Sequence, residues 1–292
     1  MLFSKPQLRT KRDFINIKKQ NIMKYKLLLL SAFYTFAMLT IWIALNTYLT
    51  GSIWQGMAIS KSALTVEYCE YNHVEKFFHQ SMNTYSNLAY FFFGILICQI
   101  AFEDYKNVKA SNLNRMEQFP MLSLLMGFCF IYLSIGSAFF HASLTWIGQR
   151  VDMNGTYGIS IILASIGFYN VFHKVEFQSK AKNLIVMTLL LLIMLFYKIA
   201  LMVSSSVLIP ILILLLLLLI GINYVQFRKV RSFILGILSF VLIIVAIKIR
   251  TLDVQKIGCD PDSWYQGHAV WHLLTSMSSF CSYAFFRFTN FQ

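Results

Sequence analysis

The chain has 292 residues, of which 58% are hydrophobic and only 13% are charged, and its formal net charge is +13. A typical soluble domain contains roughly 25% charged residues, so this composition excludes an ordinary soluble fold. An excess of Lys and Arg would suit a nucleic-acid partner in a soluble protein. Here apolar runs of roughly 17–25 residues recur along the chain, the length that an α-helix needs to cross a bilayer.

These runs predict eight membrane-spanning helices, since inside a bilayer every backbone polar group must be satisfied within its own segment. A transmembrane β-barrel would need alternating polarity, which the runs lack. The first run follows a basic stretch, but it exceeds the roughly 7–15 residue core of a signal peptide, so we expect it to be retained. The spans lie near residues 27–49, 84–102, 121–141, 151–172, 183–203, 207–226, 232–249 and 268–287, and the Leu/Ile-rich region between the fourth and the sixth can also be divided differently.

The distribution of charge predicts how the chain is oriented. If the basic N-terminus lies inside, most Lys and Arg residues fall in inner segments, which is the positive-inside pattern. This distribution argues against a nucleic-acid partner. We therefore predict a multi-pass membrane protein with a cytosolic N-terminus, in a bacterial inner membrane or in the endoplasmic reticulum or Golgi. The outer or lumenal face then receives the segments 50–83, 142–150 and 250–267.

Residue types that suit a metal site gather at this predicted outer face. Ser137 and His141 are four residues apart, as are His268 and His272, so each pair shares one face of a helix. Three neutral imidazoles with one open position are typical of a catalytic zinc site. The nearby Asp152 could accept a proton from water, and the Ser137 hydroxyl could donate to an oxyanion. The alternative is a set of interfacial histidines and a helix-capping Asp with no metal.

The segment before the second span is rich in side-chain oxygen atoms, from Glu67, Glu70, Asn72 and Gln80. Clustered carboxylate and amide oxygens suit a hard cation such as calcium. The alternative is a solvated acidic loop with Asx-type turns. The residues by themselves favour the loop.

The five cysteines fall into two groups. Cys69 and Cys259 lie in predicted outer segments, where an oxidising compartment permits a disulfide, and the residues alone do not decide whether the bridge forms. Cys98, Cys129 and Cys281 fall inside predicted helices, where we expect them to act as small apolar residues.

Three motifs follow one another along the chain: Glu67-Tyr-Cys-Glu-Tyr-Asn72 with Asn83-Thr-Tyr-Ser-Asn87, then Gly136-Ser-Ala-Phe-Phe-His141 with Gln149-Arg-Val-Asp152, then Gly267-His-Ala-Val-Trp-His272. In this order they resemble the alkaline ceramidase family, part of the wider group of seven-helix membrane hydrolases that includes the progestin and adiponectin receptors. The resemblance spans residues 67 to about 287. It implies an all-α integral membrane fold, a seven-helix transmembrane bundle to which this chain adds one N-terminal transmembrane helix.

On that basis the chain divides into four parts. We expect a basic cytosolic arm at 1–23, the extra N-terminal transmembrane helix at 24–50, an outer segment with a possible cation site at 51–83, and the seven-helix catalytic domain at 84–292.

The resemblance also implies roles for individual residues. Zinc would be held by His141, His268 and His272, with Ser137 steadying the oxyanion and Asp152 acting on the attacking water. A regulatory calcium ion would be held by Glu67, the Tyr68 carbonyl, Glu70, Asn72 and Gln80, and Cys69 would pair with Cys259. The chain departs from the family pattern at three positions: Gln80 stands where Glu is usual, Glu67 where Asp is usual, and Met153 where an acidic residue is usual.

The function implied by the resemblance is zinc-dependent cleavage of the N-acyl amide of ceramide-like lipids to a sphingoid base and a fatty acid. Two alternatives stay open. One is a receptor or structural membrane protein whose zinc is not catalytic, and the other is a phospholipid or lipid-anchor remodelling hydrolase on the same scaffold. The expected partners are the bilayer and a lipid substrate, and no obligate protein partner is inferred.

Overall fold

The computed structural model describes residues 11–107, 114–199 and 205–288. Within these ranges the fold is all-α and contains no strand, only two isolated bridge pairs. The helices are α1 (Lys11–Tyr48), η1 (Gly51–Trp54), α2 (Lys61–Leu64), α3 (Ser81–Tyr85), α4 (Leu88–Asn107), α5 (Pro120–Ser143), α6 (Trp146–Val171), α7 (Ser179–Ile199), α8 (Ser205–Gln226), α9 (Phe233–Val254) and α10 (Gly267–Arg287). The predicted all-α integral membrane class is confirmed.

The described residues contain one long helix in the region of each of the eight predicted spans. Six of them are long and apolar enough to cross a membrane, namely those within α1, α3–α4, α5, α7, α8 and α9. The helices α6 and α10 have similar lengths but carry more polar residues, including the site residues Asp152 and His268.

Several predicted boundaries differ from the observed ones. The span predicted at 84–102 is two helices, because the chain breaks at Ser86 and Asn87 between α3 and α4. The span predicted to end at 249 continues to Val254, which extends α9 toward the site. Helix α1 begins at Lys11, inside the segment 1–23 that we predicted as a basic arm, while residues 1–10 and the end of the span predicted at 183–203 lie outside the described residues.

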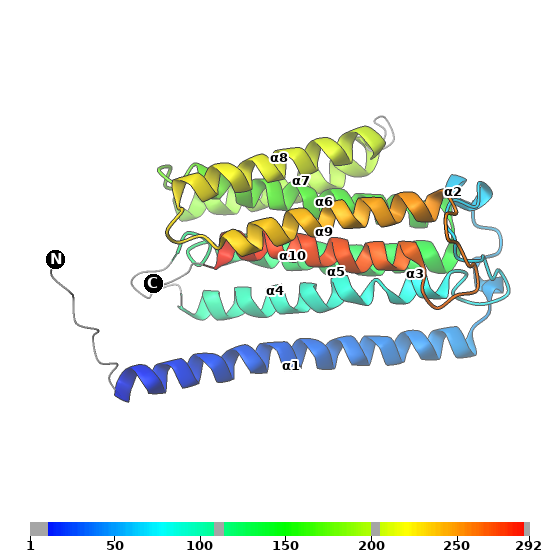
Figure 1. Ribbon diagram of the computed structural model, residues 1–292, viewed down its shortest axis with the longest axis horizontal. Helices are drawn as coiled ribbons and strands as arrows, with labels where there is room; N and C mark the ends of the chain where they lie inside the picture. Colours follow the sequence, from blue (N-terminus) through cyan, green and yellow to red (C-terminus); the bar gives the residue numbers. More distant parts are fainter. Residues whose placement is uncertain (1–10, 108–113, 200–204, 289–292) are drawn as a thin grey trace.

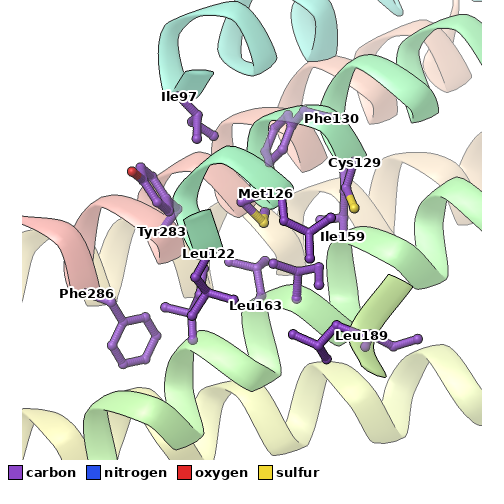
Figure 2. Packing of buried hydrophobic residues seen from close by; sticks show 14 of the residues in the cluster. Ile97, Leu122, Met126, Cys129, Phe130, Ile159, Leu163, Leu189, Tyr283 and Phe286 are labelled. Atoms are coloured by element: carbon purple, nitrogen blue, oxygen red, sulfur yellow. The ribbon is translucent and has the colours of Figure 1, made fainter. Parts of the chain in front are cut away.

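The long helices lie side by side in a bundle, with α1 along one edge beside α4 and with α7 and α8 at the opposite edge (Figure 1). The core lies where α4, α5, α6 and α10 meet, and Figure 2 shows Ile97, Phe130, Leu163 and Tyr283 turned toward one another there. Many apolar side chains on α1, α7, α8 and α9 are exposed. A lipid environment explains that exposure, since a soluble monomer rarely exposes such large apolar patches.

Helices α4 and α5 approach each other closely at two glycines. A Cβ atom at Gly127 would lie 3.0 Å from the carbonyl oxygen of Gly94 and 2.5 Å from Cys98 Sγ. Small residues at such positions let the backbones of membrane helices pack tightly. This packing fixes α5, and with it His141 at its C-terminal end, relative to α4.

The three segments predicted to share the outer face converge at one end of the bundle, where α2 and α3 also lie (Figure 1). The backbone N–H of Trp146 donates to the Ala58 carbonyl at 2.7 Å, and that of Tyr71 donates to the Pro261 carbonyl at 3.1 Å. This convergence, which the topology predicted, is confirmed.

Candidate metal centre

Three histidines from two helices come together at this end of the bundle. His141 lies near the end of α5, and His268 and His272 lie one turn apart at the start of α10. All three are buried, and one potential ligand atom from each lies within 4.8 Å of the other two. The sequence predicted this grouping, although His141 is more than a hundred residues from the other two.

Hydrogen bonds fix the protonation pattern of His141. Its Nδ1 lies 2.7 Å from Gln80 Oε1, which can only accept, so Nδ1 carries the proton and donates. Its Nε2 therefore holds the lone pair. That Nε2 is buried and has no hydrogen-bond partner among the described residues.

The same reasoning applies to His272. Its Nδ1 lies 2.8 Å from the Ser86 hydroxyl, which donates its own proton to the Asn83 carbonyl at 2.9 Å. The hydroxyl oxygen must then accept from Nδ1, so the lone pair of His272 is also on Nε2. Partners of this kind orient histidine ligands in metal sites by fixing the ring and its tautomer.

The third imidazole also has a nitrogen without a partner, because His268 Nδ1 is buried and makes no hydrogen bond within the described part of the chain. Buried polar atoms are nearly always hydrogen-bonded, so two unpartnered imidazole nitrogens in one cluster need an explanation. A three-nitrogen donor set matches the protein ligands of a catalytic zinc ion. The residues therefore fit such an ion.

The local fold places the α10 histidines through an acceptor on α9. The residue before α10, Gln266, makes no side-chain capping bond, and Asp253 Oδ1 instead accepts from the His268 N–H at 3.1 Å. A Cβ at Gly267 would lie 2.9 Å from that same oxygen, so glycine is needed for the close approach. Asp253 therefore caps the first turn of α10 from a different helix.

A tight turn between α5 and α6 brings Asp152 back to the level of His141. Leu144 adopts a left-handed backbone with φ of 52°, and the Thr145 hydroxyl then caps α6 by accepting from the Gly148 N–H at 3.2 Å. Ser137 and Asp152 consequently line the same cavity as His268 and His272. These four residues, which the sequence placed at one membrane face, line one cavity in the structure.

This cavity has a volume of about 450 Å³, and its walls are both polar and apolar. Leu133, Ile209 and Ile213 also line it. Leu133 and Ile209 also line a neighbouring apolar pocket that extends along α8 to Leu216. The Ser137 hydroxyl is buried and lies close to the Asp152 carboxylate, so both groups can reach a molecule bound in the cavity.

Each residue predicted to hold calcium has at least one oxygen that already accepts from a group of the chain itself. Glu67 Oε1 is paired with Arg250, and the Tyr68 carbonyl accepts from the Lys256 ammonium. The Glu70 carboxylate accepts from the backbone N–H groups of Met82 and Asn83 at 2.6 and 2.8 Å. Burial raises the pKa of Glu70 to about 7 even though these two N–H bonds lower it.

The remaining two candidates bond to each other, because Gln80 Nε2 donates to Asn72 Oδ1 at 2.7 Å. Calcium takes six to eight oxygen ligands, so a set whose oxygens are committed to internal donors does not fit the ion. The predicted disulfide, in contrast, is present between Cys69 and Cys259. The other cysteines are buried and unpaired, as predicted: Cys98, Cys129 and Cys281.

Four residues that lie around the site were not assigned a role there from the sequence. They are Ser86, Arg250, Asp253 and Lys256. Their signal was present in the chain, since Arg250 and Asp253 are charged residues at the end of an apolar run. Such residues in or near membrane helices mark functional sites.

The fold and the site together define a polytopic membrane protein with a buried three-histidine centre beside a serine and a carboxylate. Residues 60–292 match the model of the Ceramidase family, so the chain belongs to the ceramidase family. It is therefore a membrane amidohydrolase that acts on ceramide. The match begins after α1, and a search of curated proteins finds no similar sequence.

Proposed function

We propose that this protein is a zinc-dependent ceramidase that cleaves the N-acyl amide of ceramide-like lipids to a sphingoid base and a fatty acid. The observation that carries the proposal is the pair of buried, unpartnered nitrogens on His141 and His268, in a three-histidine cluster whose cavity also holds Ser137 and Asp152.

His141, His268 and His272 would hold the ion. When bound, zinc acts as a Lewis acid that activates water and polarises a carbonyl group. Ser137 would donate its hydroxyl proton in a hydrogen bond to the carbonyl oxygen of the amide as negative charge develops there. Asp152 would take a proton from the attacking water and deliver it to the amine nitrogen as the C–N bond breaks. The water oxygen ends in the fatty acid carboxylate.

The cavity walls support a lipid substrate. The site residues share their cavity with Leu133 and Ile209, and a mostly apolar pocket adjoins it along α8. A two-chain lipid could place an acyl chain there with its amide beside the histidines. Burying one CH₂ group is worth about 0.8 kcal/mol, so an acyl chain contributes substantially to binding.

The orientation is also part of the proposal. The disulfide between Cys69 and Cys259 lies at the same end of the bundle as the histidines. Because disulfides persist in oxidising compartments, this end would face the outer or lumenal side, and the basic N-terminus would lie in the cytosol. An alkylating reagent applied to intact vesicles tests this with single cysteines introduced at Lys61 and Lys229, of which only the first should react from the outer side.

The alternative of a structural zinc ion predicts a fourth protein ligand, as in closed zinc sites. Within the described part of the chain the group that could hold a metal comprises three histidines only. This favours an open coordination position and therefore catalysis. A lipid-remodelling hydrolase is separated from a ceramidase by comparing amide with ester lipids as substrates.

Metal analysis of the purified protein, run beside product detection from an N-acylsphingosine, tests the proposal. We expect about one zinc per chain. We also expect a chelator to remove both the metal and the activity, and zinc to restore both. A protein that retains full turnover after its metal has been removed would contradict the proposal.

A further inference from the structure

The outer segment 67–80 is in contact with the candidate metal centre. The Tyr68 ring lies against the His268 ring with a centroid distance of 4.0 Å, and Gln80 accepts from His141 Nδ1. Whatever fixes this segment therefore also fixes two of the three histidines. In an oxygen-rich segment of this kind, a bound cation could fix the backbone.

Gln80 is the residue whose hydrogen bonds oppose a cation at this place. Its Oε1 accepts from His141 Nδ1 and also from Asn83 Nδ2 at 3.1 Å. With the oxygen committed to those two donors, the NH₂ group must point the other way, and it donates to Asn72 Oδ1. The Gln80 NH₂ group, a hydrogen-bond donor, therefore occupies the position where a glutamate would have its second carboxylate oxygen. The same group also hydrogen-bonds to the Asn72 oxygen.

Cationic side chains contact the oxygen atoms of Glu67 and Tyr68 in the other part of the segment. Lys256 donates to the Tyr68 carbonyl, and Arg250 pairs with Glu67 Oε1 at 3.1 Å. Lys256 has a left-handed backbone with φ of 59°, a conformation that favours glycine. The disulfide joins Cys259, three residues after Lys256, to Cys69, the residue after Tyr68. The lysine is therefore tethered beside the carbonyl that it contacts.

We propose that this protein holds its outer segment without calcium, because the Gln80 carboxamide and the Lys256 ammonium replace the ion. Gln80 is a positioning residue for His141, and Lys256 is a positioning residue for Tyr68 and, through its ring, for His268. The calcium part of this inference is independent of the proposed function, and only the kinetic part depends on it.

The first experiment measures calcium binding by the intact, zinc-loaded protein in detergent. The wild type should bind no radioactive calcium, and its Tm should be the same with calcium as with magnesium at about 1 mM, a concentration that fills even weak sites. Saturable calcium binding with a calcium-specific rise in Tm would overturn the proposal.

The second experiment introduces the missing oxygens. In Gln80→Glu the new carboxylate faces the Asn72 oxygen, and Lys256→Met frees the Tyr68 carbonyl. The double variant should bind calcium and gain at least about 4 °C in Tm when the ion is near 100 times its Kd. The single variant Gln80→Glu should gain less, and it serves if the double variant does not fold. Correctly folded variants that gain no calcium binding also overturn the proposal.

The third experiment separates positioning from a general structural role. Gln80→Met, which removes the acceptor of His141 Nδ1, should lower kcat and speed the loss of zinc to a chelator, with little change in KM. Lys256→Arg keeps a cationic donor and should retain wild-type rates, whereas Lys256→Met should not. The matched control is Lys61→Met, an exposed lysine at the start of α2, which should behave as the wild type. Unaltered zinc retention in Gln80→Met would contradict the positioning role, whatever the activity.

Discussion

Asp253 accepts a hydrogen bond from the backbone N–H of His268 at 3.1 Å, so the last turn of α9 caps the first turn of α10. The second oxygen of the same carboxylate accepts from the Cys69 N–H at 3.2 Å. One buried side chain therefore joins the disulfide-linked outer segment to a histidine of the candidate metal centre. This link explains how loops far apart in sequence keep the site in one geometry.

Asp253→Ala should destabilise the protein. Removing the carboxylate leaves two buried backbone N–H groups without an acceptor, and each costs about 1–3 kcal/mol. The expected result is a lower Tm in detergent together with faster zinc loss, measured by thermal unfolding and by chelator competition. The control is Asp260→Ala, since Asp260 is exposed. A variant at Asp253 with unchanged stability would show that the capping bond is unimportant.

His141→Ala and His268→Ala should each abolish both zinc content and hydrolysis. Two remaining imidazoles cannot supply the three protein ligands of a catalytic zinc site. Elemental analysis and fatty acid release are the measurements. His173→Ala provides the control, because His173 follows the other end of α6, on the order of 30 Å from Asp152 at 1.5 Å per helical residue. Normal zinc content in either site variant would remove that residue from the ligand set.

Asp152→Asn should keep zinc but lose turnover. Asparagine preserves the size of the side chain, yet it cannot accept and return a proton, a function worth roughly 10²–10⁴-fold in rate. We expect kcat to fall by such a factor with zinc content unchanged. Wild-type turnover in this variant would mean that another group transfers the proton.

Ser137→Ala should lower kcat with little effect on KM. A donor to a developing oxyanion acts mainly in the transition state, and loss of one such donor costs about 10²–10³-fold. The substitution removes a single hydroxyl at the cavity wall, so Tm should change little. The measurements are steady-state kinetics and Tm, and an increase confined to KM would instead indicate a role in substrate binding.

Reduction or loss of the disulfide should destabilise the metal centre without unfolding the helix bundle. Cys69→Ser frees the loop that carries Lys256, and removing a native disulfide typically costs about 2–5 kcal/mol. We expect a lower Tm and increased zinc loss while the helical circular dichroism signal persists at room temperature. Cys281→Ser changes a buried, unpaired cysteine and is the matched control. Equal zinc loss in both variants would argue against a specific role for the bridge.

The sequence predicted the helices because hydrophobic length is a local property of the chain. All eight spans, the meeting of His141 with His268 and His272, and the convergence of the outer segments follow from apolar run length, helical spacing and topology. The sequence did not predict the break at Ser86 or the extension of α9 to Val254. Both depend on contacts with other helices, Ser86 with His272 and Asp253 with His268.

The sequence alone determined the membrane class, the number of long helices and the three histidines, since each of these depends on residue type and local spacing. Only the tertiary structure decided which atoms the oxygens of residues 67–80 accept from. A carboxylate or amide in the sequence looks the same whether it faces a cation, an arginine or an imidazole. Its partner depends on where the α9–α10 loop and the outer segment meet, which is set by long-range packing and the disulfide.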